Sequence, residues 1–452
     1  MLSNPFSRAR RHRGGDGLRI ALLGTRGAPA RYGGFETAVE EVGRRLVEDG
    51  HDVTVYCRTG NSGQTPEPRR FLGMRLVHLP AVKKSSLETL SHTFLTALHL
   101  LFQPRYDAYV LCNAANAPVL PLLKLKGTPV AVHVDGLEWR RSKWGPVGQK
   151  YYRIAESLSV RWADALIADA YGIQCYYSDE FGALTEGIAY GAPIVEPGTD
   201  KLAEMGVEPQ GYHLVVARFE PENHVDLMIE GYLRSGAQHP LVVVGSSPYS
   251  NEYNEKVRAL ADSDPRVRLV GGVWDQDLLD QLYANALTYL HGHSVGGTNP
   301  SLLRAMGAGA HTVAYDVVFN REVAGPHADY AADAAGVAAA IDKAEADPQA
   351  AHAAGRALVD RAALLYRWDD VARRYADLCV TMAAGGSQRG LYTGRRSPNS
   401  PWRKGKTPAI ELPNTVVTLP SPRAASPVPS EVGRGASSTE TAPRANAMGS
   451  GS

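Results

Sequence analysis

Residues 291–309, HGHSVGGTNPSLLRAMGAG, read as a strand end, a glycine-rich loop and the beginning of a helix. The segment LTYLHG at residues 287–292 is apolar enough to end a buried strand. Pro300 suits the first position of a helix, and Asn299 or Thr298 suits the capping position before it. The stretch therefore predicts a strand–loop–helix unit of the kind that builds parallel α/β sheets.

The glycine-rich loop has the features of an anion site. Gly296 and Gly297 allow the backbone to approach another group closely. The helix N-terminus that follows directs free N–H groups and a partial positive charge at that group, which is most often a phosphate. The alternative is an ordinary capped helix after a strand, and the stretch by itself fits both readings.

Composition indicates a globular protein with room for two domains. The chain has 452 residues, of which 44% are hydrophobic and 21% charged, and its net charge is +1. This balance provides no overall basic field for nucleic acid. The four cysteines are widely spaced and form no CxxC pair, so they indicate neither a zinc site nor a disulfide framework. The longest apolar run is too short to span a bilayer, and we expect a cytoplasmic protein.

Strands and helices alternate through most of the chain. In the first half, residues 18–24 and 51–58 read as strands joined by a loop and a helix over residues 36–49. In the second half a new series starts with a strand at residues 212–219. Strict alternation of this kind predicts an α/β protein with two Rossmann-like, doubly wound domains. The loop after the first strand does not match GxGxxG, so we predict no dinucleotide cofactor.

The predicted domain boundaries follow the alternation. Residues 383–452 are rich in Pro, Ser, Gly and Arg, with nine prolines and nine Lys/Arg against three Asp/Glu, a composition that predicts disorder. The full division is a disordered basic arm at 1–16, an N-terminal Rossmann-like domain at 17–196, a linker at 197–211, a C-terminal Rossmann-like domain at 212–363, a helix crossing back to the first domain at 364–382, and the disordered tail.

Four stretches, in this order, resemble glycosyltransferase family 4. They are GTRGAPARYGGFET at 24–37, VDGLEWRR at 134–141, ARFEPENH at 217–224 and the stretch quoted first. The resemblance covers residues 18–382. Within the family, the stretches look most like the branch with a rhamnosyltransferase-type N-terminal domain. It implies a GT-B fold, in which the N-terminal half binds the acceptor and the C-terminal half binds most of the nucleotide-sugar donor.

The resemblance also implies a set of donor-binding residues. Arg218 matches the family's phosphate-binding arginine, and a guanidinium suits that role because it is always charged. The family's usual lysine five positions later is Asn223 here, so one positive charge is missing. The backbone of the helix start would hold phosphate and sugar. The remaining matched positions are Gly33, Gly34, Gly297, Thr298, Asn299, Pro300 and Ser301.

One departure from the family concerns two glutamates that stand eight positions apart. The first falls on Gly296, a change that looks normal for this branch, and the second falls on Arg304. In the family the second glutamate accepts hydrogen bonds from ribose hydroxyls, which an arginine cannot do. Arg304 either supplies the charge lost at Asn223, since it lies on one helix face with Ser301, or points to solvent beside an inactive donor site.

The resemblance implies transfer with retention at the anomeric carbon. The leaving diphosphate would then act as base, with Arg218 stabilising its charge. An inverting path would require a base among His133, Asp135 and Glu138, and the sequence does not choose between them. His133 matches the histidine near the transferred sugar. No metal-binding Asp-x-Asp motif stands out, so we expect metal independence, with the nucleotide diphosphate sugar as co-substrate and no cofactor.

The expected acceptor is lipid-linked or a growing polysaccharide, in cell-envelope or exopolysaccharide synthesis, and the branch name makes rhamnose one candidate sugar. Basic residues with tryptophans in the acceptor half suit an anionic membrane surface, and a solvated loop is the alternative. These residues are Lys83, Lys84, Trp139, Arg140, Arg141, Lys143 and Trp144. Two other functions compete: a donor-blind homologue acting as a scaffold in polysaccharide assembly and, more weakly, an NAD-dependent sugar-nucleotide epimerase.

Overall fold

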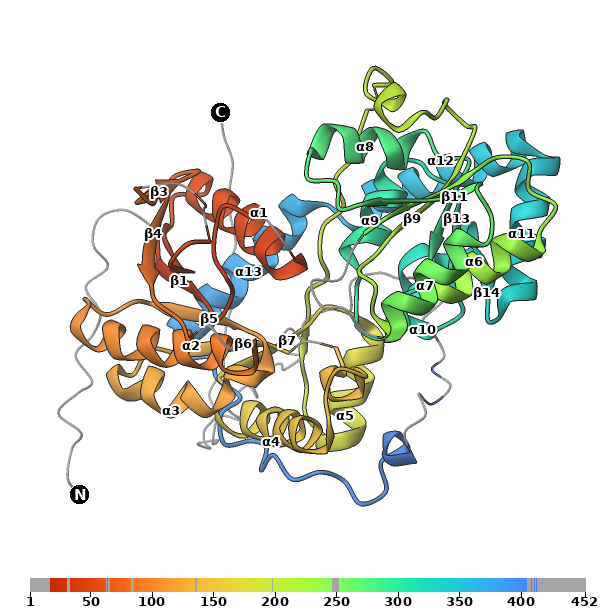
Figure 1. The fold of residues 1–452 in the computed structure, drawn as a ribbon. Helices are drawn as coiled ribbons and strands as arrows, with labels where there is room; N and C mark the ends of the chain where they lie inside the picture. Colours follow the sequence, from red (N-terminus) through yellow and green to blue (C-terminus); the bar gives the residue numbers. More distant parts are fainter. Residues whose placement is uncertain are drawn as a thin grey trace, which may run out of the picture. The chain divides into compact units, whose positions relative to one another are not determined.

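The computed structural model describes residues 17–30, 33–61, 63, 66–82, 85–134, 136–196, 198–245, 252–404, 408, 410 and 412. These residues form two parallel sheets with helices packed on both faces of each (Figure 1). Both sheets belong to the same compact unit of the chain. The prediction of two doubly wound α/β domains is confirmed. The predicted arm at residues 1–16 lies outside the described residues.

The N-terminal sheet has the strand order β3-β4-β2-β1-β5-β6-β7-β8 and is parallel except for the β3–β4 pair. The chain reverses its direction of winding between β1 and β5, so the loops after these strands diverge at a switch point. The strands are β1 (Arg19–Leu23), β2 (Asp52–Arg58), β3 (Arg70–Phe71), β4 (Met74–Leu79), β5 (Ala108–Cys112), β6 (Val130–Val134), β7 (Ala165–Ala168) and β8 (Glu186–Gly187).

Helices cover the N-terminal sheet because alternate strand residues point to opposite faces. One face packs against α1 (Gly34–Glu48), which buries Val39, Val42 and Leu46. The other face packs against four helices. These are α2 (Ser85–Phe102), α3 (Leu120–Leu123), α4 (Pro146–Trp162) and α5 (Tyr171–Phe181).

The C-terminal sheet has the order β11-β10-β9-β12-β13-β14, and its described strand pairs are all parallel. Its switch point lies between β9 and β12, the strands that precede Arg218 and the glycine-rich loop. The strands are β9 (His213–Val216), β10 (Leu241–Val244), β11 (Val267–Gly271), β12 (Thr288–His291), β13 (Thr312–Tyr315) and β14 (Asp329–Ala331).

The helices of this half include two short ones that matter for the site, α8 (Gln276–Ala284) and α9 (Pro300–Gly307). Both pack on the face of the sheet that carries Leu214 and Tyr289. The remaining helices are α6 (Val225–Arg234), α7 (Glu252–Asp262), α10 (Val318–Ala324), α11 (Ala334–Ala346) and α12 (Pro348–Leu365).

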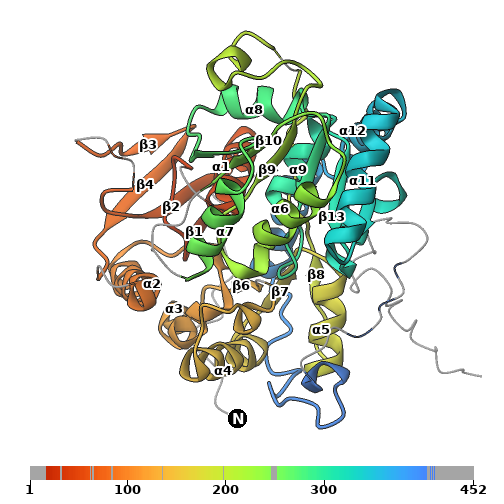
Figure 2. The same cartoon turned by 45° about the vertical axis from the view of Figure 1, so that its right-hand side comes forward.

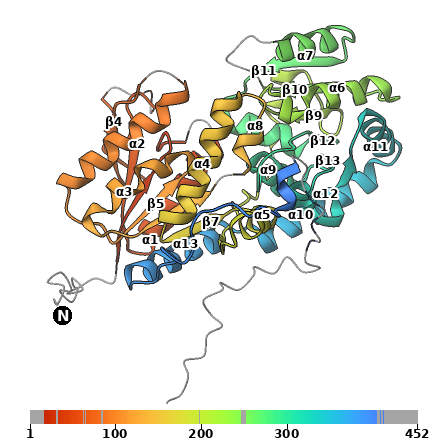
Figure 3. The ribbon, with the colours of Figure 1, turned by 90° about the horizontal axis from the view of Figure 1, so that it is seen from below.

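The last long helix, α13 (Trp368–Ala383), lies beside α1 of the N-terminal sheet (Figures 1 and 3). Tyr375 of α13 joins the core on that face of the sheet. At its start, Asp369 accepts a hydrogen bond of 2.7 Å from Arg45 Nε. The C-terminal end of the described fold is therefore anchored on the N-terminal domain.

The segment after α13 corrects the prediction of a disordered tail at residues 383–452. Residues 384–404 lie against α4 and α5 (Figure 2), with the Trp402 side chain fully buried. Composition does not show this, because the attachment depends on individual side chains such as Arg396 and Trp402 and on partners elsewhere in the chain. Most of the predicted tail beyond residue 404 lies outside the described residues. In the described part of the chain, no helix combines the length and the apolar character needed to cross a bilayer.

Candidate functional site

The N-terminus of α9 forms at the carboxyl end of the C-terminal sheet. Asn299 caps it, since its side-chain oxygen accepts hydrogen bonds from Ser301 N at 3.0 Å and Ser301 Oγ at 2.7 Å. Pro300 occupies the first turn, as the sequence predicts. In the loop before it, Gly296 has a φ of +139°, a backbone conformation that favours glycine. The free N–H groups of the first helical turn thus face out of the switch point.

A second helix N-terminus, that of α1, lies at the carboxyl end of the N-terminal sheet. Gly33 precedes the helix with a φ of +107°. Two carboxylates hold the loop before it: Glu36 accepts a hydrogen bond from Arg26 N at 3.0 Å, and Glu40 accepts one from Ala30 N at 2.7 Å. Burial raises the pKa of Glu36, although the backbone of Arg26 and nearby cations oppose the rise. The loop residues Arg31 and Tyr32 lie outside the described residues.

The two N-termini meet. A Cβ placed on Gly34, at the start of α1, would lie only 2.7 Å from Pro300 Cγ of α9. A second contact is equally close, because a Cβ on Gly136 would lie 2.5 Å from the Cα of Gly296. Two helix dipoles therefore present their positive ends at one junction, which favours a multiply charged anion.

Asp169 of the N-terminal domain lies at the junction of the two helix starts. The sequence did not single it out. It follows β7 directly, and a Cβ on Gly297 would lie 1.9 Å from its Oδ1. Thr298 is buried, and its hydroxyl donates to the main-chain carbonyl of Asp169. Thr298 therefore joins the two halves through its side chain. The strand-end position of Asp169 is the sequence signal that marks it, since ligands of parallel sheets bind at that edge.

Arg218 follows β9, across the switch point from the glycine-rich loop. Its side chain is 40% exposed and its Nη1 lies 3.2 Å from Glu220 Oε1, so a ligand can reach this residue. Asn223, expected beside it, is buried, and its amide donates to the carbonyl of Arg218 at 2.9 Å. Asn223 thus shapes the arginine loop. Burial, followed by the charges of Arg218 and other neighbours, lowers the pKa of His293 and keeps that imidazole neutral.

A second link between the halves runs through Glu222, which is buried. Its carboxylate accepts a hydrogen bond from Ser142 Oγ at 2.8 Å and lies 3.6 Å from Arg141. Its main-chain carbonyl accepts a hydrogen bond of 2.9 Å from Ser294 N in the glycine-rich loop. The 138–144 loop is therefore connected to the anion junction by two residues. No local sequence pattern marks Glu222, because its partners come from distant segments.

The Arg304 side chain is paired with a carboxylate and does not point freely to solvent. Its Nε donates to Asp280 Oδ1 of α8 at 2.6 Å, and each side chain is 24% exposed. Asp280, like Asp169 and Glu222, is a residue that the sequence did not single out. At position 304, where the resemblance implies a glutamate, the chain therefore has an arginine that binds the carboxylate of Asp280.

His133 lies inside an aromatic enclosure and away from solvent. Its ring makes edge contacts with Phe35, Tyr190 and Tyr375, whose centroids lie 5.0, 5.7 and 6.5 Å away. Burial lowers the pKa of His133 to about 3, so the imidazole is neutral at physiological pH. Within the described structure its Nε2 has no hydrogen-bond partner. This geometry gives His133 no contact with bulk water.

Glu138 is a buried carboxylate that cations surround. Lys143 Nζ lies 2.8 Å from its Oε1, Trp144 Nε1 donates to the same oxygen at 3.2 Å, and Arg141 pairs with the other oxygen. Burial favours the neutral acid, but Arg141 and Lys143 outweigh it and hold the pKa of Glu138 below its ordinary value. The third predicted base, Asp135, lies outside the described residues.

The basic and aromatic side chains of the 138–144 loop contact one another rather than forming an open surface. Arg140 lies over the Trp139 ring at 5.1 Å, and Trp144 packs on Tyr152 with ring centroids 5.0 Å apart. Lys83 and Lys84 lie outside the described residues.

Across the part of the chain that the structure describes, no group of three or more His, Cys, Asp or Glu could hold a metal ion.

Two sequence profiles match the chain, one on each half. The Glycosyl transferase 4-like domain matches residues 33–182, and the Glycosyl transferases group 1 domain matches residues 202–358. The chain belongs to the GT-B glycosyltransferase superfamily. Among proteins with curated descriptions, no sequence is significantly similar to it.

Solved structures of other glycosyltransferases share the GT-B fold. Sucrose-phosphate synthase from Thermosynechococcus elongatus superposes with a TM-score of 0.70 at 19% identity, covering 81% of this chain and 99% of that one. Anabaena HepE in complex with UDP-glucose gives 0.65 at 16% identity, covering 80% and 100%. The trehalose-phosphate synthase of Burkholderia vietnamiensis gives 0.59 at 12% identity, covering 81% and 99%. In this GT-B chain, the junction of α1 and α9 lies where the two sheets present their carboxyl edges.

Proposed function

We propose that this glycosyltransferase moves a hexosyl group from a nucleotide diphosphate sugar to a lipid-linked or polysaccharide acceptor in cell-envelope or exopolysaccharide synthesis. The observation that carries the proposal is the contact between Gly34 and Pro300, which brings two helix N-termini to one point. A diphosphate is the anion that fits such a junction, because its charge is spread over two linked phosphates. HepE, with a similar fold, has been solved with UDP and with UDP-glucose, which supports the same donor class here.

The diphosphate lies, in this proposal, within reach of Arg218. The guanidinium is exposed and sits across the switch point from α9, so it can donate to phosphate oxygens. Its present partner, Glu220, offsets the charge until a ligand with more negative charge competes for it.

In this proposal, Asp280 accepts hydrogen bonds from the ribose hydroxyls. The family's glutamate has that role, and Arg304 stands at its position here. Arg304 cannot accept a hydrogen bond from a hydroxyl, but the carboxylate of Asp280 can, and Arg304 Nε holds it at 2.6 Å. The carboxylate is partly exposed and therefore reachable. An arginine at position 304 is then part of a working donor site, because it orients the acceptor group that α8 supplies.

The proposed reaction retains the anomeric configuration and needs no metal. The acceptor oxygen bonds to the anomeric carbon on the face from which the diphosphate oxygen leaves, and that oxygen takes the acceptor's proton. Arg218 and the two N-termini stabilise the charge that develops on the leaving group. Two predicted bases fit an inverting path poorly, because His133 is enclosed and Glu138 is held by cations. The branch resemblance supports rhamnose as the transferred sugar.

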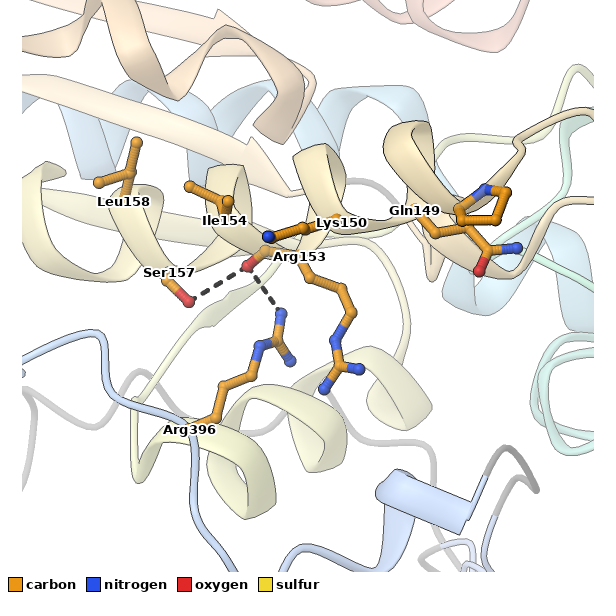
Figure 4. Close-up of a pocket in the computed structure, with 8 residues that line it drawn as sticks. Gln149, Lys150, Arg153, Ile154, Ser157, Leu158 and Arg396 are labelled. Carbon is orange, nitrogen blue, oxygen red and sulfur yellow. Dashed lines mark hydrogen bonds between the residues drawn. The ribbon is translucent and has the colours of Figure 1, made fainter.

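An exposed surface on α4 supports a lipid-linked acceptor. Val147 is 85% exposed and Ile154 49% exposed, and Lys150 and Arg153 lie between them along the helix. Beside them lies an open pocket of about 520 Å³ (Figure 4), lined by Pro146, Gln149, Lys150, Arg153, Ile154, Ser157, Leu158 and Arg396. Apolar side chains mixed with cations suit the surface of an anionic bilayer.

Flotation of the full chain with vesicles tests the α4 surface. We expect binding to vesicles of phosphatidylglycerol and phosphatidylcholine, and loss of that binding in Ile154→Glu. The matched control is Leu364→Glu, at a residue that is 75% exposed on α12 of the other domain. Equal flotation of both variants would count against a lipid-bound acceptor and leave a soluble polysaccharide.

Calorimetry with a panel of nucleoside diphosphates and nucleotide sugars tests the donor site. The full chain is used because residues 384–404 are part of the fold. Binding that Arg218→Ala abolishes would support the transferase and identify the base of the donor. Absence of binding to wild type, with binding regained in Arg304→Glu, would instead favour the scaffold function, since Arg304 would then have disabled the site.

A further inference from the structure

Residues 384–404, which we call the C-terminal strap, are fixed to the N-terminal domain by Arg396. Its guanidinium donates to Glu180 at 2.8 Å and to the Tyr176 hydroxyl at 2.9 Å, and it also pairs with Glu156. A further bond of 2.9 Å reaches the main-chain carbonyl of Arg153 (Figure 4). The strap is therefore bonded to both α4 and α5.

Trp402 provides the second attachment. The side chain is fully buried, its Nε1 donates to Asp179 at 2.9 Å, and its ring lies edge-on to Tyr176 with centroids 5.2 Å apart. The guanidinium of Arg140 also lies over this ring, 5.4 Å from the Trp402 centroid and 5.1 Å from the Trp139 centroid. One cation is thus held between an indole of the strap and an indole of the 138–144 loop.

The loop that the strap contacts has little regular secondary structure. Its only regular element is a 3-10 turn, Glu138–Arg140, and an isolated turn of this length is not stable without packing. Trp139 anchors it by donating from Nε1 to the Tyr176 hydroxyl at 3.2 Å, the same hydroxyl that Arg396 contacts. The strap and the 138–144 loop are therefore both hydrogen-bonded to the Tyr176 hydroxyl.

The same loop leads to the anion junction. Arg141, the next residue after the turn, lies 3.6 Å from Glu222, and the carbonyl of Glu222 accepts from Ser294 in the glycine-rich loop. A continuous series of packed and hydrogen-bonded groups thus runs from Trp402 through Arg140 and Arg141 to the loop before α9.

We propose that the C-terminal strap positions the 138–144 loop, and that Arg396 and Trp402 are positioning residues for nucleotide-sugar binding. The inference rests on the proposed donor site. Removal of the Trp402 ring releases Arg140 on one side, which loosens the 138–144 loop and with it the contact to Glu222. We expect Trp402→Ala to weaken nucleoside diphosphate binding by about fivefold, a size typical of coupling through packed networks.

Hydrogen exchange of the full chain tests the proposal without any ligand. Trp402→Ala should raise exchange at residues 136–144 and 292–297, while Trp402→Phe, which keeps a buried ring, should restore most protection. Leu391→Ala is the matched control, since Leu391 belongs to the strap but is 71% exposed. All proteins are compared well below their melting temperatures, so that a general loss of stability does not enter the comparison.

Two outcomes separate this inference from the donor site itself. If wild type binds a nucleoside diphosphate and Trp402→Ala binds it equally well, with unchanged exchange at residues 136–144, the strap is only a stabilising element and the proposal is overturned. If wild type binds no nucleotide, the donor site fails, and the exchange measurement still decides whether the strap orders the loop. Arg396→Lys provides a second variant with the charge retained, in which partial recovery of both readouts is expected.

Discussion

Gly34 and Pro300 lie in van der Waals contact although they are 266 positions apart in sequence, so that a Cβ on Gly34 would come within 2.7 Å of Pro300 Cγ. This contact places the starts of α1 and α9 side by side. Each helix alone offers a weak anion site, and together they direct two sets of free N–H groups at one ligand. The proposed donor site depends on this contact between Gly34 and Pro300.

Arg218 should dominate the affinity for phosphate. Arg218→Ala removes hydrogen bonds to a charged group worth about 1.5–3 kcal/mol, which corresponds to about a 10- to 100-fold weaker Kd for the nucleoside diphosphate. Titration calorimetry measures this change. Arg367→Ala is the control, because Arg367 is also exposed but lies at the start of α13. A similar loss in both variants would indicate a general charge effect.

Asp280 should recognise ribose hydroxyls. Asp280→Asn is expected to weaken binding of a ribonucleoside diphosphate by about tenfold, since it weakens a hydrogen bond to a charged group. The 2′,3′-dideoxy analogue lacks the hydroxyls, so its affinity should change little. Competition binding with the two ligands makes the comparison. Equal loss for both would show that Asp280 acts only through Arg304.

Glu322 should make stability depend on pH near neutrality. Its carboxylate in α10 accepts hydrogen bonds from Tyr171 N at 2.6 Å and Gly172 N at 3.2 Å, at the start of α5. Burial raises the pKa of Glu322 to about 7 from an ordinary value of 4.5, because it outweighs these bonds. The folded protein therefore binds the proton more tightly than the unfolded chain, and this contribution is present below pH 4.5 and lost as pH rises through 7.

Urea unfolding at several pH values checks that sign. Relative to Glu322→Gln, wild type should lose stability between pH 5 and pH 8. Parallel curves for the two proteins would mean that Glu322 does not titrate in this range. The variant keeps the side-chain size, so packing at the start of α5 is little affected.

His133 should act in packing and not as a titrating base. Since burial lowers its pKa to about 3, replacement should leave the pH profile of donor turnover unchanged between pH 5 and pH 9. His133→Ala should destabilise the protein by about 2–4 kcal/mol, because it opens a cavity among three aromatic rings. A profile that loses an ionisation near pH 6–7 in the variant would restore the catalytic role.

Local features of the site were predictable and distant contacts were not. The cap at Asn299 and the first turn at Pro300 follow from neighbouring residues, and so does the alternation that gives two doubly wound sheets. The contact of Thr298 with Asp169 joins segments 129 positions apart, which no local pattern encodes. The pairing of Arg304 with Asp280 likewise depends on how two helices pack.

The strap shows a different reason why the predicted disordered tail was wrong over residues 384–404. Composition is averaged over residues 383–452, and the average is dominated by Pro, Ser and Gly. In residues 384–404, Arg396 and Trp402 have buried partners in the N-terminal domain, and Ser387 and Tyr392 make further hydrogen bonds to it. These partners cannot be identified from the segment itself.

Nucleoside diphosphate binding to Gly34→Ala measures the central claim most directly. The added methyl group forces the starts of α1 and α9 apart, whereas in Gly145→Ala the methyl group meets no atom within 4 Å. The account predicts that calorimetry finds at least about a tenfold weaker Kd in Gly34→Ala, wild-type affinity in Gly145→Ala, and weak binding of the corresponding nucleoside without phosphate to all three proteins. Wild-type diphosphate affinity in a folded Gly34→Ala would contradict it, because the diphosphate would then not lie at the junction of the two helices.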